Sequence, residues 1–151
     1  LARTARPEAG MSRPEHTPVL LDESLAALDV SRPGLYIDCT LGLGGHAFEI
    51  LHRNPEAELI GLDLDEQAIR LAQQRLEPFG DRVTLYLSDY RNLPDIDLDF
   101  KRVRGILVDM GMSSFQLDDP GRGFSFQTEG PLDMRMDLRG RTTAARIVGP
   151  A

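Results

Sequence analysis

LYIDCTLGLGGH, residues 35–46, is a short apolar run that ends in a cluster of glycines. The apolar part, residues 35–39, has the length of a β-strand. Glycine lets the chain turn sharply after it and admits a ligand where a side chain would block it. Apolar residues at helical spacing follow in residues 47–51 and stop before Asn54 and Pro55, because proline disfavours helix in the residue before it. A strand, a glycine turn and a helix in this order predict the first unit of a parallel α/β sheet.

The same alternation continues downstream. Residues 59–62 form a second apolar run that ends in Asp63, and Asp65 is placed to cap the helix that follows, which Gly80 ends. Residues 83–87 and 105–108 are two further short apolar runs. Near-continuous apolar strands that alternate with helices predict a doubly wound α/β fold, with a parallel sheet covered on both faces.

The two ends of the chain lack this alternation. Residues 1–15 show no periodicity and predict a disordered extension. Thr17 and Pro18 predict the N-cap and first residue of a short helix with leucines at helical spacing. Residues 111–141 have no sustained period, which in a compact domain is typical of a functional loop or of disorder. Residues 142–148 predict one last short helix.

Composition narrows the class of protein. The 151 residues, 41% of them hydrophobic, fit one modest globular domain. No apolar run approaches the roughly 20 residues needed to span a bilayer, and no signal segment opens the chain. A single cysteine, Cys39, excludes an internal disulfide. We therefore expect a soluble protein of the cytoplasm.

The charge is unevenly distributed. The net charge of −7 disfavours a protein that coats nucleic acid by electrostatics alone. Residues 111–151 balance to zero, with five acidic groups and five arginines. Because arginine pairs with phosphate and stacks on bases, this third of the chain either contacts RNA or forms a solvated loop surface.

A candidate ligand site lies where the predicted strands end. In an open parallel sheet, ligands bind at the carboxyl ends of the strands, where the strand order reverses. The turn at Gly42, Gly44 and Gly45 lies there, and Asp63 ends the next strand, where an acidic group can accept hydrogen bonds from two ribose hydroxyls. The alternatives are a turn that serves packing and a carboxylate that caps a helix, although Asp65 is better placed for capping. Together the features predict a nucleoside-cofactor site.

Two cofactor classes fit this pattern. Gly42, Gly44 and Ala47 match the permissive dinucleotide spacing, so an NAD(P)-binding oxidoreductase is one alternative. S-adenosyl-L-methionine is bound at the same place without a pyrophosphate. Asp38 in the first strand and the doubled glycine at residues 44–45 favour the second class.

Other reactive side chains fit ordinary roles. Cys39 lies in or at the end of a strand, where a free cysteine is usually a small buried hydrophobe rather than a nucleophile. His46 and His52 have no companion cysteine, so the sequence predicts no metal site. Phe124 and Phe126 either stack on a flipped base or anchor a loop.

Four stretches together carry a family resemblance. They are HTPVLL at 16–21, GGH at 44–46, DMGMSSFQLD at 109–118 and PLDMRMD at 131–137. Over residues 16–148 the chain resembles the bacterial methyltransferases that modify the exocyclic N4 amine of a cytosine in small-subunit (16S) ribosomal RNA. The resemblance implies a Rossmann-like class I fold that uses S-adenosyl-L-methionine, and a substrate that is RNA in a preassembled small ribosomal subunit.

Site residues follow from the resemblance at matching positions. It implies contacts with the methionine part of the cofactor from Gly44, Gly45 and His46, with the ribose from Asp63 and with the adenine from Tyr90, where the family more often has phenylalanine. Asp109 and Gln116 complete the implied pocket. Asp109 is also the candidate catalytic residue, placed to hydrogen-bond the cytosine amine. Asp133, Arg135 and Asp137 either form a charge network that closes the site or fold their loop back on itself.

The resemblance also predicts the organisation of the chain. Residues 1–15 are an extension, residues 16–110 the N-terminal half of a methyltransferase core, and residues 111–151 a substrate loop with the start of a helical region. The four strands are then the outer half of the sheet, in the order 3-2-1-4, truncated after the fourth strand. That strand has an unpaired apolar edge at residues 106–108, a route to pairing with another chain. We therefore expect this polypeptide to bind S-adenosyl-L-methionine weakly, to self-associate and to methylate no RNA alone, and a non-catalytic cofactor-binding fragment is a further alternative.

Overall fold

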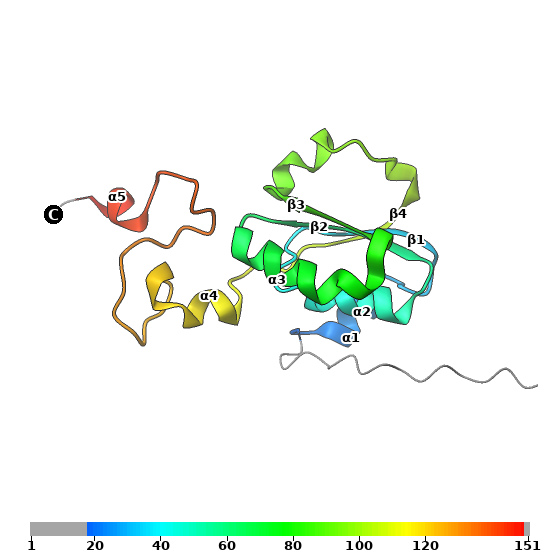
Figure 1. Cartoon of the computed structure of the whole chain (residues 1–151), viewed down its shortest axis with the longest axis horizontal. Helices are drawn as coiled ribbons and strands as arrows, with labels where there is room; N and C mark the ends of the chain where they lie inside the picture. The colour runs from blue at the N-terminus through cyan, green and yellow to red at the C-terminus, as the bar shows by residue number, and fades with distance from the viewer. Residues whose placement is uncertain (1–17, 150–151) are drawn as a thin grey trace, which may run out of the picture.

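The structure, a computed structural model, describes residues 18–149, and these residues form one parallel sheet (Figure 1). Its strands are β1 (Gly34–Asp38), β2 (Ala57–Asp63), β3 (Val83–Leu87) and β4 (Val103–Leu107). Their spatial order is β3-β2-β1-β4, so the strand order reverses between β1 and β4. This order confirms the predicted doubly wound α/β fold and the predicted arrangement 3-2-1-4.

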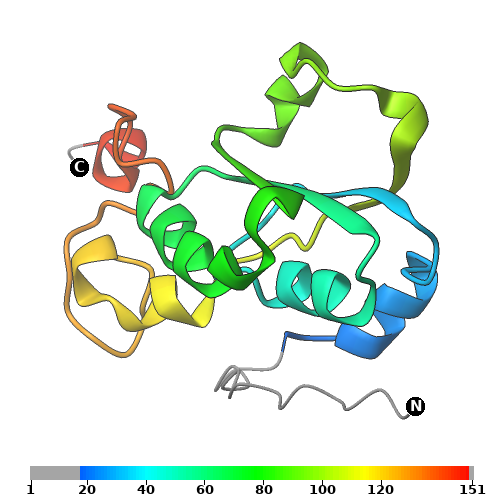
Figure 2. The same ribbon diagram turned by 45° about the vertical axis from the view of Figure 1, so that its right-hand side comes forward.

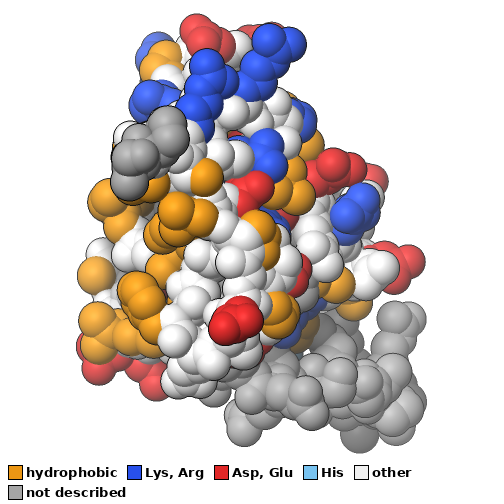
Figure 3. Space-filling view, turned by 90° about the vertical axis from the view of Figure 1, so that its left-hand side faces the viewer, with side chains coloured by type: hydrophobic (Ala, Val, Ile, Leu, Met, Phe, Trp, Pro, Cys, Tyr) orange, Lys and Arg blue, Asp and Glu red, His pale blue; other side chains and the backbone are white. Residues whose placement is uncertain are grey.

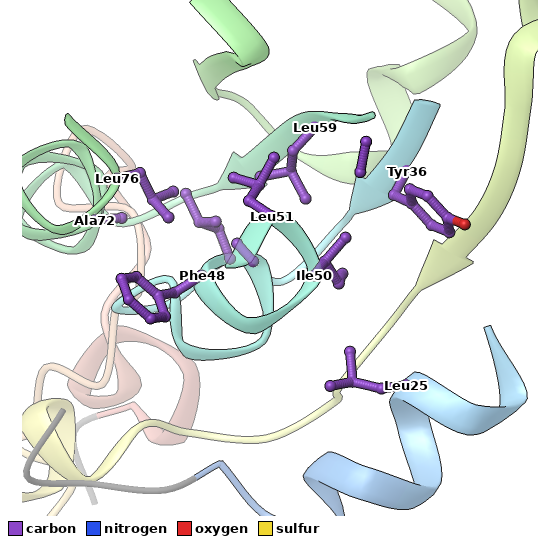
Figure 4. Packing of buried hydrophobic residues seen from close by; sticks show 11 residues of the cluster. Leu25, Tyr36, Phe48, Ile50, Leu51, Leu59, Ala72 and Leu76 are labelled. Atoms are coloured by element: carbon purple, nitrogen blue, oxygen red, sulfur yellow. The ribbon is translucent and has the colours of Figure 1, made fainter. Parts of the chain in front are cut away.

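One face of the sheet is covered by α-helices. They are α1 (Leu21–Ala27), α2 (Gly45–Arg53) and α3 (Glu66–Leu76). The side chains between these helices and the sheet include Tyr36, Leu51, Leu59 and Leu76, each at most 2% exposed (Figure 4). Because burying a large apolar side chain contributes about 1.5–3 kcal/mol, this layer stabilises the sheet and holds the strand ends in place.

The opposite face is covered by irregular chain. Residues 88–102 cross it, with short 3-10 turns η2 (Tyr90–Asp95) and η3 (Phe100–Arg102) (Figure 2). Leu93, Ile96 and Leu98 of this segment pack on the second buried cluster of the sheet, which includes Ile37 and Leu62. Pro94 lacks an N–H and every second residue from 95 to 99 is aspartate, so no α-helix forms. The prediction that both faces are covered is confirmed, although an α-helix covers only one of them in the described residues.

Two predicted helix ends differ from the structure. Helix α1 begins at Leu21, preceded by Leu20 with a φ of 52°, so Pro18 is not its first residue. Thr17 and the predicted extension at residues 1–15 lie outside the described residues. Helix α3 ends at Leu76, and the chain continues as the 3-10 segment η1 (Glu77–Arg82), interrupted at Gly80 with a φ of 56°.

The C-terminal third of the described chain lies beside the end of the sheet where α3 begins, on the left of Figure 1. It contains α4 (Ser114–Asp118), η4 (Pro120–Arg122) and α5 (Ala144–Val148), joined by irregular segments. Helix α5 confirms the predicted last helix, whereas α4 was not predicted. Helix α4 starts with a capping box, because the side chains of Ser113 and Gln116 each accept a hydrogen bond from the backbone N–H of the other residue. The S-x-x-Q pattern of residues 113–116 is the sequence signal for this helix that the prediction missed. Within residues 18–149, no helix has the length and apolar character to cross a membrane.

Candidate cofactor site

Asp63, the last residue of β2, joins the glycine turn to the start of α3. Its Oδ2 accepts a hydrogen bond from the Gly42 amide at 2.8 Å, and its Oδ1 accepts one from the Asp65 amide at 2.9 Å. A carboxylate has about four acceptor sites, so each oxygen retains one for a ligand hydroxyl. The bonds also fix the plane of the carboxylate before any ligand arrives.

The glycines of the turn have different reasons to be glycine. Gly42 and Gly44 have left-handed φ values of 51° and 75°, which side chains rarely adopt. A Cβ on Gly44 would lie 3.4 Å from the Cβ of Ala72 in α3, and one on Gly45 would lie 2.5 Å from Cγ of Pro18. Only the space beside Gly42 is open, with a backbone oxygen 3.9 Å away as its single neighbour. Backbone conformation therefore explains Gly44, and close packing explains Gly45. Room for a ligand lies at Gly42, which the sequence placed in the candidate turn but which was not among the implied cofactor contacts.

The first turn of α2 offers unsatisfied polar groups. Gly44 is its N-cap, and no side chain caps the turn. His46, in that turn, is 7% exposed, and its Nε2 has no hydrogen-bond partner in the described part of the chain. Burial lowers the pKa of His46, while the charge of Asp109 and the Val19 carbonyl act in the opposite direction. An uncapped helix start suits a carboxylate such as that of a bound amino acid.

Acidic side chains gather at the same edge. Asp38 ends β1, is 1% exposed and accepts a hydrogen bond from the Thr40 amide at 3.1 Å. Burial raises the pKa of Asp38 to about 7, the Thr40 amide lowers it, and the charges of Asp63 and Asp109 raise it further. Asp109 follows β4, is exposed, and its amide donates to Thr40 Oγ1 at 2.7 Å. The resulting negative potential favours a cationic ligand and disfavours a pyrophosphate.

Tyr90 and Gln116 reach this edge in different ways. Tyr90 follows β3 and is 40% exposed, so its ring is available to a planar ligand. Gln116 is buried, and its side chain is engaged at both ends: Nε2 donates to Asp65 Oδ2 at 3.1 Å, and Oε1 accepts from the Ser113 amide at 3.1 Å. The tertiary structure thus brings the predicted residues to one edge of the sheet, with Gln116 held there by Asp65.

Sequence reasoning underestimated Asp65 and missed Arg122. Asp65 caps α3 as predicted, because its Oδ1 accepts from the Gln67 amide at 2.9 Å. Its Oδ2 also accepts from Arg122 Nη1 at 2.7 Å, which makes a buried ion pair. Arginine between two glycines before an apolar residue, at 121–124, is the one local signal for it.

The structure gives ordinary surroundings to Cys39 and His52, the remaining candidates for a nucleophile or a metal ligand. Cys39 is buried and free, and burial, followed by the charge of Asp38, raises the pKa of its thiol, which disfavours a nucleophilic thiolate. His52 stacks on Phe48 with ring centroids 5.7 Å apart. Among residues 18–149, no three side chains of His, Cys, Asp or Glu are grouped to hold a metal ion.

The structure also bears on two alternatives in the C-terminal third. Phe124 is 5% exposed, with the Arg122 guanidinium 5.9 Å from its ring, so it anchors the loop, whereas Phe126 is fully exposed. Arg135 bonds Asp133 at 2.7 Å and the carbonyls of residues 138 and 140, and Arg139 bonds Asp137. These charges therefore fold the loop back on itself.

A doubly wound sheet with a glycine turn and acidic strand ends at its reversal point defines a Rossmann-like α/β protein of the class I methyltransferase type. The chain belongs to the MraW methylase family, whose sequence profile matches residues 13–150.

Two curated relatives show how far the similarity extends. Ribosomal RNA small subunit methyltransferase H of Symbiobacterium thermophilum is 52% identical over 136 residues, which cover 88% of this chain and 43% of the relative. The protein of the same name from Carboxydothermus hydrogenoformans is 50% identical over 135 residues, 88% of this chain and 43% of the relative. An rRNA methylase structure from Streptococcus thermophilus is similar with a TM-score of 0.41 and 26% identity, over 58% of this chain and 49% of that one. The chain thus spans less than half the length of the curated relatives that it matches.

Proposed function

We propose that this chain binds S-adenosyl-L-methionine at the carboxyl edge of its sheet and forms the cofactor-binding part of an enzyme that methylates the N4 amine of a cytosine in small-subunit ribosomal RNA. The observation that carries the proposal is the identity of about half the residues with relatives named for small-subunit ribosomal RNA methylation. Because the aligned range covers 88% of this chain, it includes the strand ends that form the candidate site.

The donor set supports this cofactor over a dinucleotide. The cofactor carries a sulfonium cation, an amino-acid carboxylate, a ribose and an adenine. The acidic strand ends at Asp38, Asp63 and Asp109 suit the cation and the ribose, the uncapped start of α2 suits the carboxylate, and Tyr90 suits the adenine. A pyrophosphate at this edge faces the repulsion of the Asp63 and Asp109 carboxylates, and of Asp38 when it is ionised, which disfavours the alternative of an NAD(P)-binding oxidoreductase.

Each residue of this chain has a defined task in the proposed reaction. When bound, the cofactor supplies an activated methyl group. Asp63 orients the ribose through the acceptor sites that its amide bonds leave free. His46 stays neutral in its buried position and directs Nε2 toward the methionine portion.

Asp109 orients the cytosine that receives the methyl group. The cytosine amine is a poor nucleophile because its lone pair is delocalised into the ring, so it needs orientation and a hydrogen-bond acceptor as charge develops. Asp109 is exposed and its backbone is fixed by Thr40, so its carboxylate accepts a hydrogen bond from the amine. The base must be unstacked to reach it, which favours a single-stranded segment of RNA in the small subunit.

Titration calorimetry tests the cofactor. We expect S-adenosyl-L-methionine to bind and NAD to bind at least about tenfold more weakly. Asp63→Ala should weaken S-adenosyl-L-methionine binding by at least about tenfold, because a hydrogen bond to a charged group contributes about 1.5–3 kcal/mol. Asp81→Ala is the matched control, since Asp81 is exposed and precedes β3 at the opposite edge of the sheet. Preferential binding of NAD would overturn the proposal.

Methyl transfer to small ribosomal subunits tests the reaction. We expect transfer from a chimera in which this chain continues into the C-terminal part of the Symbiobacterium relative, and loss of transfer when the chimera carries Asp109→Ala. The 151 residues alone should transfer no methyl group. A chimera that binds the cofactor yet methylates only another class of RNA contradicts the proposed substrate.

A further inference from the structure

Arg122 is a buried cation that the proposed function does not use. The residue is 4% exposed and ends the short turn η4. Its guanidinium donates from Nη1 to Asp65 Oδ2 at 2.7 Å and from Nη2 to the carbonyls of Arg135 and Met136, both at 3.0 Å. One side chain therefore bonds two segments that are separated from it by 57 and by 13–14 residues.

Asp65 connects this cation to the cofactor edge. The Asp65 amide donates to Asp63 Oδ1 at 2.9 Å, and Asp65 Oδ1 caps α3 through the Gln67 amide. Asp65 Oδ2 accepts from both Arg122 and Gln116. A continuous series of hydrogen bonds thus runs from the ribose-binding candidate Asp63 to Arg122. The side chains of Asp65 and Arg122 are 3% and 5% exposed, so water does not screen their charges.

The loop that Arg122 holds is closely packed at the same place. The Met134 amide donates to the Arg122 carbonyl at 3.0 Å, which pairs the two segments in both directions. A Cβ on Gly123 would lie 2.0 Å from the Pro131 carbonyl oxygen, and one on Gly130 would lie 2.2 Å from that of Pro120. The two segments approach so closely that only glycine fits, and the guanidinium lies at the junction between this loop and α3.

We infer that Arg122 is a positioning residue that locks the loop of residues 119–136 onto the N-cap of α3 and thereby orders the cofactor edge. The inference rests on the proposed cofactor function. Without Arg122, Asp65 retains a buried and uncompensated charge, so it turns toward solvent, releases Gln116 and no longer holds its amide against Asp63. Cofactor affinity therefore depends on a side chain that acts through Asp65.

Hydrogen exchange and calorimetry on Arg122→Met test this inference. The amides of Met134, Ala144 and Ala145, which bond carbonyls of residues 122, 133 and 132, should exchange at least tenfold faster in the variant. Amides in the middle of α3 should exchange as in the parent, which shows that the variant is folded. S-adenosyl-L-methionine should bind at least tenfold more weakly. Arg139→Met is the matched control, because Arg139 lies in the same third of the chain in an exposed pair with Asp137 and should change either quantity less than twofold.

Two further variants separate positioning from general stability. Arg122→Lys keeps the charge on Asp65 but cannot also bond both carbonyls, so it should restore part of the affinity. Asp65→Asn keeps the cap of α3 and should weaken binding as Arg122→Met does, and the double variant should be no weaker than either single one. The inference would be overturned if Arg122→Met had the same amide exchange rates and the same affinity for S-adenosyl-L-methionine as the parent chain. Failure of the parent chain to bind S-adenosyl-L-methionine would instead overturn the proposed function. The exchange measurements would still show whether Arg122 holds the loop of residues 119–136 on α3, because they do not depend on the cofactor.

Discussion

At the scale of single residues, three aspartates that lie within 28 positions of one another have different surroundings. Asp38 is buried with one amide donor, Asp63 receives two amides, and Asp65 pairs with a buried guanidinium. Burial raises the pKa of Asp38 to about 7. Burial also acts to raise the pKa of Asp65, but the hydrogen bonds from Gln116 and Arg122 outweigh it and the pKa is lowered. Residues of one type thus acquire different protonation behaviour from their environment.

The raised pKa of Asp38 predicts a specific dependence of stability on pH. The carboxyl has a pKa near 3.9 when unfolded and about 7 when folded, so the folded state binds more protons between these values. The free energy of unfolding should therefore fall as pH rises from about 4 to about 7, by at most about 4 kcal/mol from this group. Asp38→Asn removes this contribution, so the variant should gain stability relative to the parent across that range. Urea unfolding at several pH values measures the difference.

Asp81→Asn is the control for this experiment, because Asp81 is exposed. Its difference from the parent should be the same at every pH. Parallel pH profiles for the parent and Asp38→Asn would contradict the assignment of a raised pKa to Asp38.

At the scale of elements, Arg82 joins the end of a helix to the start of two strands. It ends η1 immediately before β3, and its guanidinium donates to the carbonyls of Leu51, Asn54 and Ala57 at 3.0–3.2 Å. Leu51 lies in the last turn of α2 and Ala57 begins β2. A cation at the end of a helix also interacts favourably with the helix dipole. The Arg82 side chain thus links the end of α2 to the start of β2, at the amino ends of the strands and away from the cofactor site.

Arg82→Met should destabilise the chain without weakening the cofactor site. Three carbonyls lose a charged donor, so we expect the free energy of unfolding to fall by about 1–3 kcal/mol. Urea unfolding measures the change, and calorimetry should show an affinity for S-adenosyl-L-methionine like that of the parent. Arg70→Met is the control, since Arg70 forms an exposed i,i+4 pair with Glu66 that contributes about 0.5 kcal/mol or less. If the two variants had the same free energy of unfolding, the Arg82 hydrogen bonds would contribute no more than an exposed ion pair.

At the scale of the whole molecule, the apolar surface of the described chain includes the free side of β4 and the C-terminal third. Strand β4 pairs only with β1 among the described strands, and beside this edge Ile106 and Val108 are 47% and 45% exposed. In the C-terminal third, Phe126, Ile147 and Val148 are among the exposed side chains. Figure 3 shows hydrophobic side chains spread over that end of the molecule, with Lys and Arg side chains gathered at its top. An unpaired apolar edge strand is a template for pairing with another chain.

We predict that the chain self-associates through β4. Ile106→Lys places a charge beside the strand edge, which disfavours edge-to-edge pairing, so it should weaken self-association at least about fivefold. Sedimentation velocity over a range of concentrations measures the change. Leu71→Lys is the control, because Leu71 is a partly exposed apolar residue on α3, away from the edge. A parent chain that stays monomeric at about 100 μM, or an equal effect of the two variants, contradicts a role for β4.

The sequence by itself determined the four strands and helices α2 and α3, whereas α4 and the 3-10 segments were not predicted. Strands β1, β2, β3 and β4 begin and end within two residues of the predicted runs, because apolar periodicity, glycine turns and the Asp65 cap are local signals. It also indicated which edge carries the candidate site, since strand ends in a parallel sheet lie together. The family resemblance supplied residue roles such as those of Tyr90 and Gln116, which local patterns do not contain.

The tertiary structure alone decided which side chains meet. Arg122 pairs with Asp65 across 57 positions, and Gln116 reaches the same carboxylate across 51. No local pattern encodes such a distance, because it depends on how the C-terminal third packs against α3. The same holds for Phe124 and Phe126, two residues apart, of which one is buried and the other fully exposed. Burial and long-range pairing are properties of the packed chain, so they set the pKa of Asp38 and the partner of Asp65. Local sequence set only the positions of these residues, at the end of β1 and at the N-cap of α3.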